Sequence, residues 1–312
     1  MIRFVTIPVV FILLLLTLII FSPLHFAGDL GLCLASPNQW HLPKFFGWLI
    51  NSGLIFLSSI IIGNANKKYN FIQEIEPVMP MAFLLIMSCN CITTATLTTS
   101  TLLLFINVLS LYVILSTYEE YNASRQFFVL GTLPAFGSMI QYSFLLMIPV
   151  YVGGGLLMKS FRLRELIAFI FGLVAPYWIV MGLGWVSFSS FRMPEAMTIF
   201  NTSSVDNDIF LSLVALLAMA VVALIIALYN SMRLYTRNSR LRCMHLSINL
   251  MGFVAALAVI FDFNNFPAYW GTIALWFSIE LATLLALYDI RHPRYTLGII
   301  LIIFLPLYIL TI

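Results

Sequence analysis

Six polar side chains stand where they could do chemistry. They are His25, Asp29, Gln141, Asp206, Asp208 and Glu280. His25 and Asp29 are four residues apart, which places both on one face if that segment forms a helix. A positioned carboxylate or imidazole can accept a proton from a reacting hydroxyl, so both are candidate catalytic residues.

Asp206 and Asp208 form the second candidate site. The stretch Asp206-Asn207-Asp208 places two carboxylates two residues apart. Carboxylate oxygens are preferred ligands of hard divalent cations, including a cation bound to phosphate, so this pair is a candidate metal site and a divalent cation is the candidate cofactor. The alternative is a solvated loop that caps a helix beginning at Ile209.

Glu280 is the most conspicuous polar residue, because it lies near the middle of an apolar run, ten residues after Trp270 and nine before Asp289. A charge at the centre of a membrane span costs ~2.5–3.5 kcal/mol on insertion scales. Glu280 must therefore face other helices or an aqueous cavity. It is either functional or a protonated, hydrogen-bonded structural residue. Gln141, between two short apolar runs, is the second polar residue predicted inside the membrane.

The composition shows what positions these residues. Of the 312 residues, 62% are hydrophobic and only 9% are charged, with a mean hydropathy of +1.04. Soluble domains are roughly 45–50% apolar and about 25% charged, so a water-soluble globule is excluded. The sequence predicts an all-α integral membrane protein, with residues 1–312 forming one transmembrane domain and no soluble domain. Its partner is the lipid bilayer; no nucleic-acid partner is expected.

About 20 apolar residues cross a bilayer as a helix, and the chain has about eleven such runs. We expect spans at 4–21, 45–63, 78–88, 95–117, 127–140, 142–158, 166–188, 210–232, 246–261, 270–288 and 297–312. A single helix from Pro77 to Tyr118 would be ~63 Å long, twice the hydrocarbon thickness. A break near Cys89-Asn90-Cys91 is therefore predicted, and Gln141 marks a second turn.

The basic residues predict the orientation, because cytoplasmic loops are enriched in Lys and Arg. With the N-terminus inside, the cytoplasmic side receives Arg3, Lys67, Lys68, Arg125, Lys159, Arg162, Arg164, Arg233, Arg237, Arg240, Arg242, Arg291 and Arg294. Only Lys44 and Arg192 fall outside. The C-terminus is then also outside. Cys33, Cys89 and Cys91 map to the outer side, where a disulfide is permitted but not implied.

The middle of the chain resembles a known group of proteins. The features are a short hairpin with Gly131, Pro134 and Pro149, then Phe161-Arg162-Leu163-Arg164-Glu165, Gly172 and Pro176-Tyr177. Between Phe45 and Trp185 this layout resembles an uncharacterised family of bacterial multi-pass inner-membrane proteins. The resemblance implies location in the bacterial cytoplasmic (inner) membrane.

The same layout is more distantly similar to the GT-C superfamily of glycosyltransferases, which use polyprenyl-phosphate sugar donors. In that superfamily a catalytic acidic residue lies in the first outer loop, which corresponds here to Asp29. The resemblance implies a membrane glycosyltransferase or glycan-assembly component acting at the outer face, with a polyprenyl-phosphate lipid as partner. Asp29 stands alone, whereas the GT-C loop is usually longer and often has paired acidic residues.

The competing hypothesis is a non-catalytic protein: a transporter, a lipid-handling protein or a scaffold subunit bound to other membrane proteins. In a transporter, Glu280 and the broken hairpin at Gln141 would line a passage. A pocket near Asp29 that opens outward and toward lipid would favour the transferase. A cavity around Glu280 with access to both faces would favour transport, and solidly packed spans would favour a scaffold.

Overall fold

The computed structural model describes residues 43–72, 78–94, 96–140, 142–183, 207–234, 238–261, 263–288, 298, 300 and 302–304. Every element within these residues is a helix. Several predicted features lie outside the described residues, namely His25, Asp29, Cys33, Gln141, Asp206, the side chains of Cys91 and Asp208, the whole first span and most of the last.

The helices follow one another along the chain with short connections. They are α2 (Lys44–Tyr69), α3 (Val78–Ser88), α4 (Cys91–Thr94), α5 (Thr99–Ser116), α6 (Ser124–Ile140), α7 (Ile148–Leu157), α8 (Leu163–Gly182), α9 (Asn207–Leu234), α10 (Ser239–Phe261) and α11 (Trp270–Leu287). The segments Tyr142–Met147 and Phe263–Tyr269 are 3₁₀ helices. Within the described residues, six helices are long and apolar enough to cross a bilayer. The chain is thus an all-helical protein of the integral membrane class.

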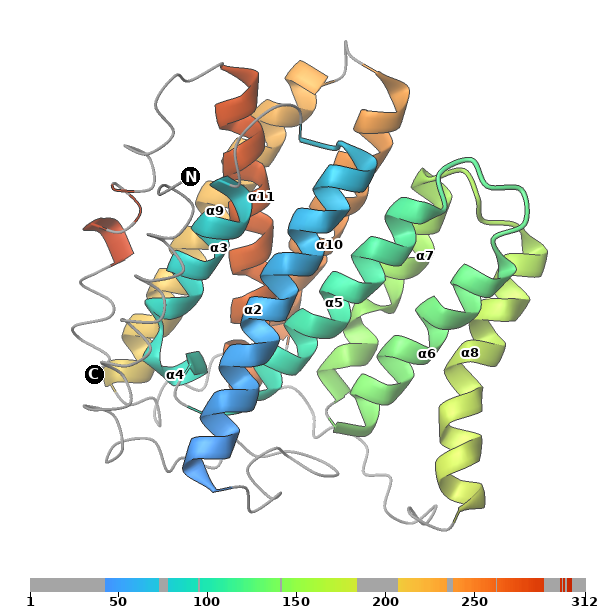
Figure 1. Cartoon of the computed structure of the whole chain (residues 1–312), viewed down its shortest axis with the longest axis horizontal. Helices are drawn as coiled ribbons and strands as arrows, with labels where there is room; N and C mark the ends of the chain where they lie inside the picture. Colours follow the sequence, from blue (N-terminus) through green and yellow to red (C-terminus); the bar gives the residue numbers. More distant parts are fainter. Residues whose placement is uncertain are drawn as a thin grey trace.

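Helix α11 forms the centre of the bundle, and helix α8 lies at one edge (Figure 1). In the most apolar window of α11, 78% of residues are buried, and the helix packs against α3, α5, α9 and α10. In α8 the corresponding share is 22%. Its outward side chains are large and apolar, among them Phe171 and Trp178. Such a surface suits contact with lipid rather than water.

The predicted break after the third span is confirmed. Helix α3 ends at Ser88 and α5 begins at Thr99, four residues later than the expected start of that span. The reason lies in α2, where the buried Asn51 side chain donates hydrogen bonds to the carbonyl oxygens of Thr93 and Thr94, at 2.9 and 3.1 Å. Asn51 thereby satisfies the carbonyl groups at the end of the short helix α4, so the chain need not continue as a helix.

The chain also turns where Gln141 was expected to mark a turn. Helix α6 ends at Ile140, and a 3₁₀ helix leads into α7, which has Pro149 in its first turn. Gly137 permits this sharp return, since a Cβ atom built there would lie only 1.9 Å from the ring of Phe144. Proline in a first helical turn loses no hydrogen bond, because that N–H has no partner within the helix.

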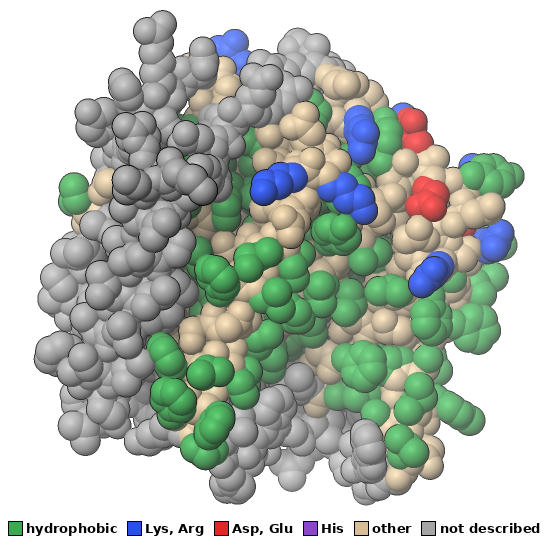
Figure 2. Space-filling view, in the orientation of Figure 1, with side chains coloured by type: hydrophobic (Ala, Val, Ile, Leu, Met, Phe, Trp, Pro, Cys, Tyr) green, Lys and Arg blue, Asp and Glu red, His purple; other side chains and the backbone are tan. Residues whose placement is uncertain are grey.

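The described basic side chains gather at one end of the bundle (Figure 2). This basic end consists of the C-terminal ends of α2, α5, α7, α9 and α11 and the N-terminal ends of α6, α8 and α10. Its basic residues are Lys67, Lys68, Arg125, Lys159, Arg162, Arg164, Arg233, Arg240 and Arg242. All nine were assigned to the cytoplasmic side from the sequence, and their shared position agrees with that assignment.

Two glycines allow the backbones of α6 and α8 to touch. A Cβ atom on Gly131 would lie 2.2 Å from the carbonyl oxygen of Phe169, and one on Gly172 would lie 2.2 Å from that of Phe128. Small residues at helix crossings let two membrane helices approach closely and gain van der Waals contact. The two glycines named in the sequence resemblance therefore form one packing contact.

We expect Gly172→Ala to lower the free energy of unfolding by about 1–3 kcal/mol, because overpacking forces the two backbones apart. Gly182→Ala is the matched control in the same helix, since a Cβ there meets nothing within 4 Å. This change should stay within about 0.5 kcal/mol. Unfolding of the purified protein in mixed micelles measures both, and equal effects of the two substitutions would contradict the packing argument.

Candidate functional site

Helix α11 carries three buried polar side chains, one per turn, on one face. They are Thr272, Trp276 and Glu280, spaced four residues apart, and we call them the α11 polar stripe. Each is bound by an asparagine from a different helix. The bundle therefore fixes its central helix with side-chain hydrogen bonds as well as with apolar packing.

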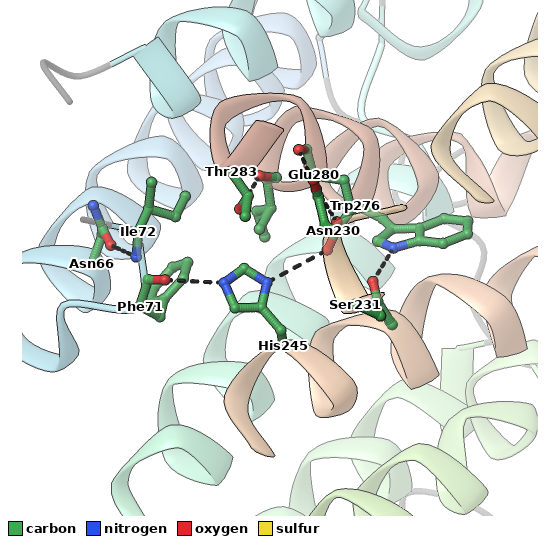
Figure 3. A network of polar contacts seen from close by, with 11 residues as sticks. Asn66, Phe71, Ile72, Asn230, Ser231, His245, Trp276, Glu280 and Thr283 are labelled. Carbon is green, nitrogen blue, oxygen red and sulfur yellow. Dashed lines mark hydrogen bonds and ion pairs between the residues drawn. The ribbon is translucent and has the colours of Figure 1, made fainter. Parts of the chain in front are cut away.

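Glu280 is fully buried, and Asn230 of α9 holds it (Figure 3). The amide nitrogen Nδ2 of Asn230 donates to both the Glu280 backbone carbonyl, at 2.9 Å, and the carboxyl oxygen Oε2, at 2.7 Å. One amide thus fixes both the backbone and the side chain. The other carboxyl oxygen, Oε1, is left facing α10.

His245 of α10 faces that second oxygen. Its Nδ1 atom lies 3.6 Å from Glu280 Oε1, and both side chains are buried. Neither atom has a hydrogen-bond partner among the described residues. On the other side of the ring, Nε2 lies 3.0 Å from the carbonyl oxygen of Phe71. A carbonyl can only accept, so this contact requires the proton on Nε2 and leaves Nδ1 of the neutral ring as an acceptor.

The turn after α2 places the Phe71 carbonyl. Asn70 ends the helix in the left-handed conformation, with φ 50°, and its N–H donates to the Asn66 carbonyl. Asparagine adopts this conformation more readily than most residues, which suits it to the end of a helix. The Asn66 side chain then accepts a hydrogen bond from the backbone N–H of Ile72 at 2.8 Å. Two asparagines thus fix the backbone that contacts His245.

The Glu280–His245 pair is built to hold one proton. With one proton, the pair is either a neutral carboxyl beside a neutral imidazole or a carboxylate beside an imidazolium, and both states have zero net charge. Losing that proton leaves a buried negative charge, and a second proton leaves a buried positive charge. Either state is costly in an apolar interior. The net charge of the pair therefore responds to anything that brings water or an ion near it.

The pair lies on the basic side of the bundle. Asn230 is four residues from the end of α9, His245 is six from the start of α10, and Glu280 is seven from the end of α11. At 1.5 Å per residue these separations are about 6 to 10 Å. The shortest route from the pair to solvent therefore runs to the basic end.

Trp276, the middle member of the stripe, donates its indole N–H to Asn249 of α10 at 3.0 Å. The Asn249 amide donates in turn to the hydroxyl of Ser231 on α9, at 3.2 Å. Gly252 makes room for the indole, since a Cβ atom there would lie 1.9 Å from the Trp276 ring. This contact joins three helices one turn away from the Glu280–His245 pair.

Thr272 begins the stripe at the end of α11 far from the basic residues. Its hydroxyl accepts a hydrogen bond from Asn107 of α5 at 2.9 Å. Asn107 also accepts one from the Tyr151 hydroxyl of α7 at 2.9 Å. All three side chains are buried, so this network ties α5 and α7 to the central helix.

Among the sequence-predicted site residues whose side chains are described, Glu280 is buried within the bundle. His25, Asp29, Gln141 and Asp206, and the side chain of Asp208, lie outside the described part of the chain. Their roles as catalytic, intramembrane polar or metal-binding residues stay predictions. Within the described residues, no three His, Cys, Asp or Glu side chains come together in a group that could hold a metal ion.

The sequence reasoning missed His245 and the three asparagines. Asn107, Asn230 and Asn249 all lie inside predicted spans, and an amide within an apolar helix needs a partner, so they carried a usable signal. His245 falls one residue before the expected span at 246–261 and was counted with the loop of Arg240 and Arg242. Helix α10 in fact begins at Ser239, which brings His245 into the bundle.

Glu165 is a second buried carboxyl group, with a different environment. It lies in the first turn of α8, and the Ser124 hydroxyl at the start of α6 donates to it at 3.4 Å. A negative charge in the first turn of a helix is stabilised by the N–H groups exposed there. Glu165 therefore has a structural explanation that Glu280, in a helix interior, does not share.

We expect Glu280→Ala to lower the free energy of unfolding by about 3–5 kcal/mol, because it leaves buried groups of Asn230 and His245 without their partner. Glu280→Gln keeps an oxygen for Asn230, so its cost should be nearer 1 kcal/mol. Glu119→Gln, in an exposed loop, is the control and should change stability by less than about 0.5 kcal/mol. Unfolding in mixed micelles gives all three values. Equal costs for the Ala and Gln variants would contradict the assigned hydrogen bonds.

Comparison with known proteins adds no family assignment. No protein-family model, curated protein or solved structure matches this chain. The resemblances noted from the sequence stay predictions. Any function must therefore be argued from the buried polar groups and the membrane-type bundle that holds them.

Proposed function

We propose that this protein is a multi-pass membrane transporter in which the Glu280–His245 pair binds and releases a proton as the protein changes conformation. The observation that carries the proposal is the 3.6 Å approach of two buried titratable atoms, neither with another hydrogen-bond partner in the described residues. Ionisable residues inside a membrane bundle commonly mark proton or ion pathways.

The energetics support a coupled rather than a static role. In the closed bundle the pair is most stable with one proton and zero net charge. A conformation that admits water or a cation beside Glu280 stabilises the carboxylate and allows the proton to leave. The proton therefore binds the closed state better than the open one, and such a difference in affinity is what shifts a conformational equilibrium.

The positions of the pair's contacts support the same proposal. Glu280, His245 and Asn230 lie on three different helices, and the Phe71 carbonyl belongs to the connection after α2. A movement of any of these elements changes the distance across which the proton is shared. The single proton is thus linked to the relative positions of α9, α10, α11 and the α2–α3 connection.

We expect proteoliposomes containing the full chain to conduct protons under an imposed membrane potential, as reported by a pH-sensitive dye inside the vesicles. Glu280→Gln should reduce the rate at least about tenfold, a barrier change of ~1.4 kcal/mol, because an amide cannot exchange the proton. Glu119→Gln is the control, since it removes a carboxyl group from the exposed loop before α6, and it should conduct like the wild-type chain.

Two outcomes would contradict the proposal. Wild-type vesicles that conduct no faster than empty ones would favour the scaffold hypothesis. A Glu280→Gln variant that folds and conducts like the wild type would assign proton movement to another part of the chain.

The GT-C-like transferase is the second candidate, and its support comes from the sequence. His25 and Asp29 are expected together in the first outer loop, and Asp206 and Asp208 could hold a divalent cation beside a lipid phosphate. On this hypothesis Asp29 accepts the proton of the acceptor hydroxyl, or coordinates that hydroxyl, while the polyprenyl phosphate leaves. The bacterial inner membrane is the location that this hypothesis implies.

If the transferase hypothesis holds, membranes containing the chain should transfer sugar from a polyprenyl-phosphate donor, and Asp29→Asn should reduce the rate by about 10²-fold or more, as expected for loss of a general base. Glu119→Gln serves again as the control. The measurement is the amount of labelled sugar released from the lipid. An Asp29→Asn variant with full activity would remove this candidate.

A further inference from the structure

We propose that the basic end binds the phosphate of an anionic phospholipid through Lys68 and Arg240, beside Tyr112 and Tyr118. This inference does not depend on the proposed proton chemistry. It concerns the place where α2 and α10 reach the C-terminal end of α5.

Lys68 is held between two aromatic rings. Its ammonium nitrogen lies 5.2 Å from the ring centre of Tyr69 and 5.1 Å from that of Tyr112, and it donates to the Tyr112 hydroxyl at 3.2 Å. These contacts position the cation without neutralising it, because an aromatic ring carries no net charge. The Tyr112 hydroxyl, which accepts from Lys68, can still donate its own proton to a phosphate oxygen.

Arg240 extends the same arrangement on α10. Its guanidinium lies 5.8 Å from the ring centre of Tyr118, just beyond the end of α5, and the Tyr118 hydroxyl contacts that of Ser239 at 3.5 Å. Both Lys68 and Arg240 are exposed. Two fixed cations and two tyrosine hydroxyls at one helix end match the charge and hydrogen-bonding needs of a phosphate diester.

The nearest carboxyl groups along the chain are engaged elsewhere. Glu119 forms an ion pair with Lys159 at 3.0 Å, and this ammonium holds the pKa of Glu119 below its ordinary value. Glu120 accepts a hydrogen bond from Gln126 at 2.9 Å. Both acids that follow Tyr118 therefore point their charge toward other partners, and the positive charge of Lys68 and Arg240 is available to an anion.

A lipid, rather than free phosphate, is favoured by the surface of α2 next to Lys68. Leu57, Ile60 and Asn64 precede Lys68 at helical spacing on one face, and all three are exposed, with 42% and 44% of the Leu57 and Ile60 surface accessible. In Figure 2 the hydrophobic side chains continue below the basic ones on the same side of the molecule. A lipid can place its phosphate at Lys68 and its acyl chain along Leu57 and Ile60.

The test uses the purified full chain in nanodiscs of phosphatidylcholine with added phosphatidylglycerol. Native mass spectrometry counts the phosphatidylglycerol molecules that stay bound after detergent release. The site variant combines Lys68→Gln with Arg240→Gln. The matched control combines Lys159→Gln with Arg164→Gln, which removes the same net charge from the same end. We expect the site variant to bind phosphatidylglycerol about fivefold less tightly for each cation removed.

The control variant should retain the lipid like the wild type, and Tyr112→Phe should weaken retention while keeping the ring under Lys68. Equal losses in the site and control variants would show a non-specific charge effect and overturn the proposal. So would displacement of phosphatidylglycerol by millimolar inorganic phosphate, or equal retention of phosphatidylcholine. If the double site variant does not fold, the comparison of Tyr112→Phe with the wild type decides.

Discussion

A polar group inside an apolar bundle must find its hydrogen-bond partner within the protein, and this constraint organises the structure around α11. The three members of the polar stripe each meet an asparagine from another helix. Where no water competes, one missing partner costs more than the bond itself contributes. The asparagines of α5, α9 and α10 therefore specify how each helix sits against α11, which apolar contact alone does only loosely.

Close packing follows from the same contacts. The indole of Trp276 can reach Asn249 only because Gly252 leaves the space that its ring fills. Gly271, beside Thr272, has the equivalent role, since a Cβ there would approach Leu104 at 2.9 Å, and its N–H donates to the Ser100 hydroxyl. Small residues and polar residues thus act together: the glycines set the distance between helices, and the hydrogen bonds set their rotation and register.

Much of the fold was predictable from the sequence because hydropathy and chain length are local properties. The helix ends at Ser88 and Ile140 follow from the length limit on a span, and the burial of Glu280 follows from its place in an apolar run. The pairing with His245 was not predictable, because it joins residues 35 positions apart across two helices. Span prediction also placed His245 in a loop, since nearby Arg240 and Arg242 outweighed the apolar residues that follow. The same limit applies to Asn51, whose effect on the start of α5 comes from a different helix.

The asymmetry of the polar stripe gives the bundle a direction. At the Thr272 end the contacts are uncharged and join hydroxyl and amide groups, whereas the titratable pair lies at the other end of the stripe, near the basic residues. A proton reaching Glu280 from the basic end has about 6 to 10 Å of helix to cross, and from the opposite end it would have to pass the Trp276 and Thr272 contacts. Because the Nε2 of His245 is committed to the Phe71 carbonyl, a change at Nδ1 acts directly on the connection that follows α2. The element that responds first to the charge of the pair is therefore this connection and not the apolar core.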